Sequence, residues 1–261
     1  GKGNIITDCS DLATGDLTLP TRKDGLPVVE IGAEAFYKSN LTSVKINTSV
    51  KTIGWYAFSG STKLASVEIK DNVTDINWFA FSDCTSLKTI AVGNGVEKIE
   101  PATFAGCTSL ETVTLGKKVS TIGWSSFKGC SNLTTISLPN TVTSIDRYAF
   151  YGCDNLTTIT FCGTEAERNA ITKGEGNSAL SNANLQFHSY ENGVCTFCQT
   201  TYCANNGHSM QQTKPAVDAT CETAGKTAVL TCSICGATEG GVEIPAAGHK
   251  MKQTAETVDP T

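Results

Sequence analysis

The sequence predicts an α/β solenoid of short strands and short helical turns, followed by a small, mostly β or irregular module rich in cysteine and histidine. Two observations predict this organisation. Apolar residues recur at a strict interval of 23 residues through the first part of the chain, and all three histidines fall after residue 187 together with six of the twelve cysteines. A fixed period of this length indicates stacked coils, because a single coil cannot bury its apolar face alone.

Four columns of apolar side chains carry the repeat. They are Leu41, Leu64, Leu87, Leu110, Leu133 and Leu156; Val50, Val73, Val96, Val119 and Val142; Ile53, Ile76, Ile99, Ile122 and Ile145; and Phe58, Phe81, Phe104, Phe127 and Phe150. At the start of one coil, the apolar residues Leu41, Val44 and Ile46 predict a short strand. Later in the coil, Ala57 and Phe58 predict a helical turn that packs inward on the next coil.

The coil resembles the repeat of the BspA-like leucine-rich repeat family, which carries the same I-G-x-x-A-F-x-x-C-x-x-L pattern. Residues 15–36 are similar to the first coil of that family, and residues 161–187 to its closing segment. The resemblance implies a leucine-rich-repeat solenoid on a bacterial protein that is secreted or displayed at the cell surface, in a family whose roles are adhesive or unknown. We accordingly expect an N-terminal cap and first coil over 1–40, five 23-residue repeats and the start of a sixth over 41–160, a C-terminal cap over 161–187, and one or two Cys/His-rich modules of a truncated array over 188–261.

Charge and hydropathy restrict the partners. The formal net charge is −5, and this acidic balance argues against nucleic acid or an anionic membrane surface as a partner. No apolar run approaches the roughly 18 residues that a spanning helix needs, so we expect no membrane insertion. Because the chain starts at Gly1 without a signal peptide, we expect a segment of a longer secreted or cell-surface protein. We also expect it to be a monomer.

A column of cysteines follows the phenylalanines by three residues, with Ser61 at the same position of an earlier coil. The column consists of Cys84, Cys107, Cys130 and Cys153. It predicts buried, reduced thiols that act as small hydrophobes. The alternative is a metal or redox ladder, since neighbours lie about 5 Å apart if the coils are spaced like paired strands. Cys9 and Cys162 are predicted to be isolated, because opposite ends of a solenoid are beyond disulfide reach.

The module after residue 187 offers two candidate zinc sites. Gly-His recurs at 207–208 and 248–249, which indicates a repeated unit similar to the Cys/His-rich repeats of bacterial surface proteins. Thiolate and imidazole groups at this spacing suit structural, tetrahedral zinc. Disulfides are the alternative in an oxidising compartment, and free thiols are a third. The candidate ligands are Cys221, Cys232 and Cys235 with His208 or His249, and Cys195, Cys198 and Cys203 with His188 or His208.

The sequence shows no catalytic constellation. Residues 1–187 contain no histidine that could activate a serine or cysteine, and a closed four-ligand zinc set leaves no open coordination position. We therefore expect no enzyme, but an extracellular recognition or adhesion module that binds a host or matrix protein or a glycan. The alternative is a structural spacer of a larger surface protein, with no ligand of its own.

All three tryptophans share one position of the coil, two residues after the isoleucine column. Residues of the types that dominate binding hot spots gather at this position and the next. The predicted ligand-binding set is Trp55, Trp78, Trp124, Tyr56, Tyr148 and Arg147. Such a strip suits the stacking of sugar rings or the anchoring of a peptide. The plainer interpretation is that each ring lies flat over the neighbouring coil, seals the side of the solenoid and binds nothing.

Overall fold

The computed structural model describes residues 3–187 apart from 8, 10–12 and 164, and after them only the short strands within 190–244. The chain divides into two compact units, Gly1–Ser189 with Thr196–Cys198, and Tyr190–Cys195 with Gln199–Thr261. Among the described residues, no helix combines the length and apolar character that crossing a membrane requires.

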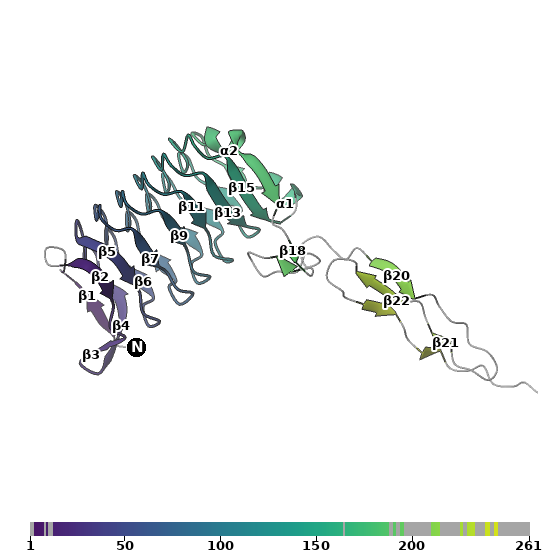
Figure 1. The fold of residues 1–261 in the computed structure, drawn as a ribbon, viewed down its shortest axis with the longest axis horizontal. Helices are drawn as coiled ribbons and strands as arrows, with labels where there is room; N and C mark the ends of the chain where they lie inside the picture. Colours follow the sequence, from purple (N-terminus) through teal and green to yellow (C-terminus); the bar gives the residue numbers. More distant parts are fainter. Residues whose placement is uncertain are drawn as a thin grey trace, which may run out of the picture. The chain divides into compact units, whose positions relative to one another are not determined.

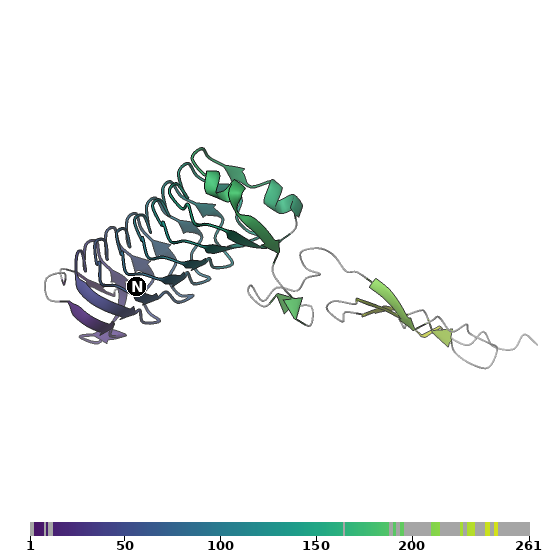
Figure 2. The same ribbon diagram turned by 45° about the horizontal axis from the view of Figure 1, so that its top comes forward.

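The first unit is a parallel β-solenoid of about seven turns (Figures 1 and 2). The longer strands of successive coils pair in parallel in the orders β2-β5-β7 and β9-β11-β13-β15-β17. Their bounds are β2 (Thr14–Thr18), β5 (Asn40–Lys45), β7 (Ser66–Glu68), β9 (Thr89–Ala91), β11 (Thr112–Thr114), β13 (Thr135–Pro139), β15 (Thr158–Cys162) and β17 (Asn184–Phe187).

A second strand of each coil, usually of two residues, pairs in parallel in the orders β1-β4-β6-β8 and β10-β12-β14-β16. These strands are β1 (Asn4–Ile6), β4 (Leu26–Ile31), β6 (Thr52–Ile53), β8 (Asp75–Ile76), β10 (Lys98–Ile99), β12 (Thr121–Ile122), β14 (Ser144–Ile145) and β16 (Thr172–Lys173). The strand β3 (Arg22–Lys23) pairs antiparallel with β4 at the N-terminal end.

Equivalent residues lie on one another because the pairing register equals the 23-residue repeat. Ile53 pairs with Ile76 across β6 and β8. Consecutive rings from Phe36 to Phe150 stack face to face, with centroids 5.1–5.5 Å apart, and all of them are buried. The predicted solenoid core is therefore confirmed, and one coil step equals the spacing between stacked rings.

The predicted helical turn around each core phenylalanine is wrong. Tyr56 and Gly60 have left-handed φ angles of 53° and 72°, and L-residues enter this region singly, not as part of a helix. The N–H groups of alternate residues point to the next coil: those of Tyr56, Phe58 and Gly60 donate to the carbonyls of Trp78, Ala80 and Ser82. The N–H groups of the residues between them donate to the carbonyl three residues earlier in the same coil. These bonds run from Ala57 to Gly54, from Ser59 to Tyr56 and from Ser61 to Phe58.

Bonding between coils thus takes every second N–H group of the turn, and a helix cannot form within one coil. The described helices are two short ones near the C-terminal end of the solenoid, α1 (Glu165–Asn169) and α2 (Ser178–Asn182). The fold is a leucine-rich-repeat-like parallel β-solenoid with little helix, and the α/β expectation is corrected accordingly.

The cysteine column is buried and made of free thiols, as predicted. Each Sγ donates to the carbonyl oxygen of a core phenylalanine one coil earlier at 3.1–3.2 Å, as Cys107 does to Phe81. Burial raises the pKa of Cys107 to about 12. The thiolate, which is the reactive form, is therefore strongly disfavoured.

The prediction that Cys162 is isolated is wrong. Cys162 is disulfide-bonded, and its partner lies outside the described side chains. Cys9 is a free thiol, so the two cysteines are not joined to each other, as their places at opposite ends of the solenoid require. Spacing in the repeat could not reveal this bond because Cys162 lies outside the cysteine column.

Beyond the solenoid, the described backbone consists of short antiparallel pairs. β20 (Met210–Lys214) pairs with β22 (Val229–Cys232), which also pairs with β23 (Thr238–Gly240). Two further pairs are β21 (Gly225–Lys226) with β24 (Glu243–Ile244), and β18 (Tyr190–Glu191) with β19 (Val194–Cys195).

Candidate functional site

The predicted ligand-binding residues lie on one turn of successive coils, directly after the two-residue strands. Trp55, Trp78 and Trp124 are 59%, 51% and 41% exposed. Six of the eight large hydrophobic side chains that are exposed among the described residues belong to this turn: Trp55, Tyr56, Trp78, Trp124, Tyr148 and Tyr151. We call the predicted set of Trp55, Tyr56, Trp78, Trp124, Arg147 and Tyr148 the aromatic strip.

Hydrogen bonds between coils fix the backbone of the strip. The Tyr56 N–H donates to the Trp78 carbonyl at 3.2 Å, and Tyr56 itself has the left-handed φ that is uncommon for a bulky side chain. The same turn recurs in each coil, so Trp78 follows Trp55 after one coil step. Pro101 occupies the same position in the next coil, and Trp124 occupies it in the coil after that.

The tyrosines of the strip are partly engaged in packing. Tyr56 stacks on Phe79 with ring centroids 4.8 Å apart and the planes 2° from parallel. Tyr148 donates from its hydroxyl to Glu175 at 3.1 Å, and this bond raises the pKa of Tyr148 because its charged form would face a carboxylate. Tyr148 also meets Tyr151 edge-on at 5.9 Å. Tyr56 and Tyr148 therefore fit the sealing interpretation. Trp55, Trp78 and Trp124, which we call the tryptophan row, stay accessible.

Polar hollows accompany the tryptophan row. Trp78 Nε1 donates to Glu100 Oε2, one coil further on, at 2.9 Å. Glu100 in turn lines a cavity of about 420 Å³ whose charged and amide groups are Asp75, Asn77, Glu97, Lys98, Glu100 and Lys118. A second cavity of about 510 Å³ borders Trp124 and Arg147, with Ser144, Asp146 and Thr172 among its other groups. In both cavities, groups of opposite charge nearly balance.

Sequence reasoning missed Glu100 and Tyr151 as members of this surface. Glu100 directly precedes Pro101 in the tryptophan column, so the repeat register alone places it one coil from Trp78. Tyr151 lies one position after the core residue Phe150, and its exposure (54%) follows from the turn geometry that the sequence did not predict.

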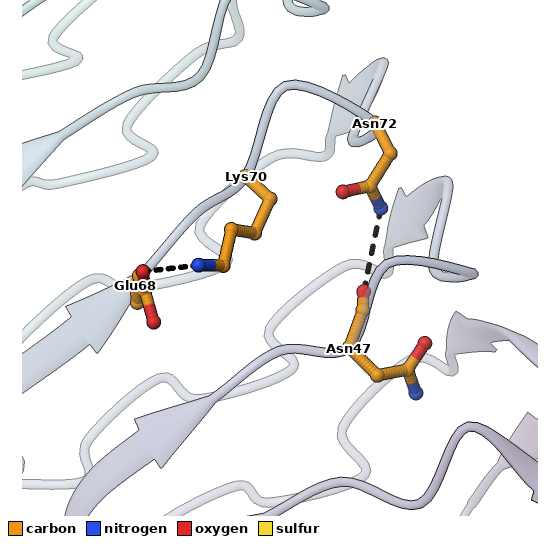
Figure 3. A network of polar contacts seen from close by, with 4 residues as sticks. All are labelled: Asn47, Glu68, Lys70 and Asn72. Atoms are coloured by element: carbon orange, nitrogen blue, oxygen red, sulfur yellow. Dashed lines mark hydrogen bonds and ion pairs between the residues drawn. The ribbon is translucent and has the colours of Figure 1, made fainter.

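The strand face is the alternative surface, and its polar groups largely satisfy one another. Glu68 forms an ion pair with Lys70, and Asn72 Nδ2 donates to the Asn47 carbonyl at 3.3 Å (Figure 3). A hollow of about 800 Å³ lies over β5 and β7, but no aromatic residue lines it. The equivalent positions of this face carry a small, mixed set of residues, of which Ser137 is buried: Lys45, Glu68, Ala91, Thr114, Ser137 and Thr160.

The predicted zinc ligands lie outside the described side chains. They are Cys195, Cys198, Cys203, Cys221, Cys232, Cys235, His188, His208 and His249. Structural zinc in the second unit therefore stays a prediction.

Comparisons with known proteins match the repeat region. The family described as BspA type Leucine rich repeat region matches residues 29–157 and 84–208, in six copies. A T. pallidum leucine-rich repeat protein, TpLRR, is 33% identical with a TM-score of 0.54, over 61% of this chain and 85% of that one. A leucine-rich repeat protein from Eubacterium ventriosum is 27% identical with a TM-score of 0.54, over 69% of this chain and 45% of that one.

A leucine-rich cell surface protein from Faecalibacterium prausnitzii is 30% identical with a TM-score of 0.48, over 57% of this chain and 48% of that one. This chain thus spans less than half of the E. ventriosum and F. prausnitzii structures. None of the curated proteins compared with the chain matches it.

The repeat pattern, the stacked phenylalanine core and the family match agree with one another. The family match begins within β4, in the first coil, and ends after β17, the last strand of the solenoid. The chain belongs to the BspA-type leucine-rich repeat family.

Proposed function

We propose that this chain is a recognition module of a secreted or cell-surface bacterial protein, and that it binds a protein or glycan ligand through the aromatic strip. The exposure of the tryptophans is the observation that supports this most. Trp55 and Trp78 are more than half exposed, although leucine, valine, isoleucine and phenylalanine already fill the core of each coil. Rings that contribute little to the core are available to a ligand.

A ligand that covers these rings would gain appreciable binding free energy. A tryptophan side chain buries roughly 200 Å² of surface when it is fully covered. Covering the exposed half of one ring therefore contributes about 2.5 kcal/mol at about 25 cal/mol per Å². Two neighbouring rings of this kind are sufficient for the centre of a binding hot spot.

A structural spacer is the competing proposal. The stacking of Tyr56 on Phe79 and the hydrogen bond from Trp78 to Glu100 support it, since both are contacts within the solenoid. However, a spacer has no use for three tryptophans that each remain at least 41% exposed. Exposed aromatic residues gathered on one face favour a binding role.

An array of soluble glycans and matrix proteins, probed with the intact chain, tests this proposal. The variants are Trp55→Ala/Trp78→Ala and, as a matched control, Leu26→Ala, which truncates a residue of β4 that is 42% exposed and lies outside the strip. We expect at least one ligand that the intact chain and the control retain and the double variant loses. A chain that binds nothing on the array, or a ligand held equally by all three proteins, would favour the spacer or a different surface.

A further inference from the structure

We infer that the ligand of the aromatic strip is a linear, uncharged polysaccharide that lies along the axis of the solenoid. This inference rests on the proposed function and specifies its ligand. It follows from three properties of the strip: its repeat distance, its narrowness, and the balance of charge beside it.

The repeat distance matches a chain of sugar rings better than an extended peptide. Equivalent rings in the core lie 5.1–5.5 Å apart from coil to coil, and the strip follows the same register. Side chains on one face of an extended peptide recur at roughly 6.6–6.8 Å, twice the rise per residue, so they drift by more than 1 Å at each coil. A pyranose unit in a linear glycan is about as long as one coil step, so successive units would stay in phase with the turns that carry Trp55, Trp78 and Trp124.

The strip is also narrow. Its tryptophan row is one residue wide, and the residue before that row in each coil is small or polar: Gly54, Asn77, Glu100 (before Pro101) and Gly123. An amphipathic helix shares the 5.4 Å repeat of its pitch, but it needs an apolar groove that accepts a stripe about 100° wide. A sugar ring needs only one aromatic face, with polar groups at its edge.

The polar groups beside the rings suit hydroxyl groups. The first cavity holds the carboxylates Asp75, Glu97 and Glu100 against the ammonium groups Lys98 and Lys118. Carboxylates accept hydrogen bonds and ammonium groups donate them, and a sugar hydroxyl can do both. A strongly charged ligand would meet repulsion from one set or the other, so the near balance of charge selects a neutral ligand.

Glu100 connects the cavity to the row of rings. Its Oε2 accepts the Trp78 indole N–H at 2.9 Å, which holds one edge of the ring toward the cavity and leaves the ring 51% exposed. A ring held in place before binding loses less conformational entropy when the ligand arrives. Glu100 is thus a positioning residue for Trp78 as well as a candidate partner for a hydroxyl group.

The test titrates the full chain with neutral β-linked oligomers of glucose, mannose and xylose, from two to six units long, by calorimetry and tryptophan fluorescence. The span from Trp55 to Trp124 covers three coil steps, so four units are needed to reach both ends. We expect the affinity for at least one series to rise at least tenfold between two and four units and to level off by six.

Variants separate this inference from the proposed function. Trp124→Ala is expected to remove the gain between two and four units, and Glu100→Gln to weaken binding about threefold to tenfold, whereas Leu26→Ala changes neither. Failure of all three neutral series would overturn the inference. If a matrix protein or an anionic polymer such as heparin then binds in a manner that depends on Trp55 and Trp78, the proposed function stands without the polysaccharide. If nothing binds through these rings, both are wrong.

Discussion

Trp78 and Glu100, which lie in neighbouring coils, are joined by a hydrogen bond of 2.9 Å from the indole Nε1 to the carboxylate Oε2. The bond links an exposed ring to a polar cavity and gives the strip a fixed element. We expect Glu100→Ala to free the Trp78 ring, shift its fluorescence emission to longer wavelength and increase its quenching by acrylamide. The free energy of unfolding should change by less than about 1 kcal/mol, because the Trp78 ring is half exposed and Glu100 is partly exposed, so water screens the bond.

Glu100→Gln is the matched control for this change, since it removes the charge and retains an oxygen acceptor. Its fluorescence should stay close to that of the unchanged chain. Equal emission and quenching in Glu100→Ala, Glu100→Gln and the unchanged chain would mean that the bond does not hold the ring.

The phenylalanine stack carries much of the solenoid's stability. Phe104 is fully buried, and its ring lies between Phe81 and Phe127 at centroid distances of 5.5 and 5.4 Å. Phe104→Ala should lower the free energy of unfolding by about 3–5 kcal/mol, as measured by urea denaturation. Phe104→Leu should cost clearly less, because it keeps most of the buried apolar area. A loss below about 1 kcal/mol in the alanine variant would contradict a continuous stacked core.

The cysteine column should be chemically inert in the folded state. Cys107 is buried, and its pKa is raised from about 9 to about 12 by burial. Thiol reagents at pH 8 should modify Cys107 only after denaturation, which mass spectrometry of labelled peptides can detect. Because the folded pKa lies above the unfolded one, the thiol's contribution to stability is complete below pH 9 and declines as the pH rises toward 12.

Cys107→Ser provides the control for this column. Ser61 occupies the same position in an earlier coil, where its hydroxyl donates to the Phe36 carbonyl at 2.8 Å, just as Cys107 donates to Phe81. The serine variant should therefore fold, and its free energy of unfolding should fall less between pH 9 and 12 than that of the unchanged chain. Rapid labelling of Cys107 in the native chain would show that the column is open.

The Cys/His-rich unit should bind zinc. The set of Cys221, Cys232 and Cys235 with His208 or His249 predicts about one zinc ion in protein purified without added metal. A strong chelator or acid should unfold this unit and leave the solenoid intact, because the ligands must be deprotonated to bind. Less than a tenth of an equivalent of zinc by elemental analysis, with a mass two hydrogens lower for each cysteine pair, would favour disulfides. The disulfide at Cys162 already supports that alternative.

Periodicity predicted the core because the register of a solenoid is the repeat itself. A strict step of 23 residues fixes which residues stack, so the spacing of like residues was enough to assign the columns of Phe58 and Ile53. The turn after Ile53 could not be predicted, since the left-handed φ at Tyr56 is a consequence of bonding to the next coil. Local propensity gives little guidance there, because Gly54, Tyr56 and Gly60 are weak helix formers, and the hydrogen bonds to the next coil decide the conformation.

The position of the tryptophans in the sequence predicted that they lie together, but not whether they pack or project. That outcome depends on the direction each ring takes from its turn: Trp55 projects into solvent, whereas Tyr56, the next residue, stacks on Phe79. Glu100 was missed for a related reason: the register places it one coil after Trp78, but only the direction of the indole N–H shows that the two groups are bonded.

The tryptophan row is proposed to bind a ligand without being required for folding. Both halves of this proposal are tested together by the affinity of Trp55→Ala/Trp78→Ala for whichever ligand the intact chain binds, with a melting curve on the same sample. We expect at least a tenfold loss of affinity and a melting temperature within about 3 °C of the unchanged chain, which corresponds to about 1 kcal/mol or less. A variant that melts far lower and keeps its affinity would contradict the proposal, since the rings would then be packing and the ligand would bind elsewhere.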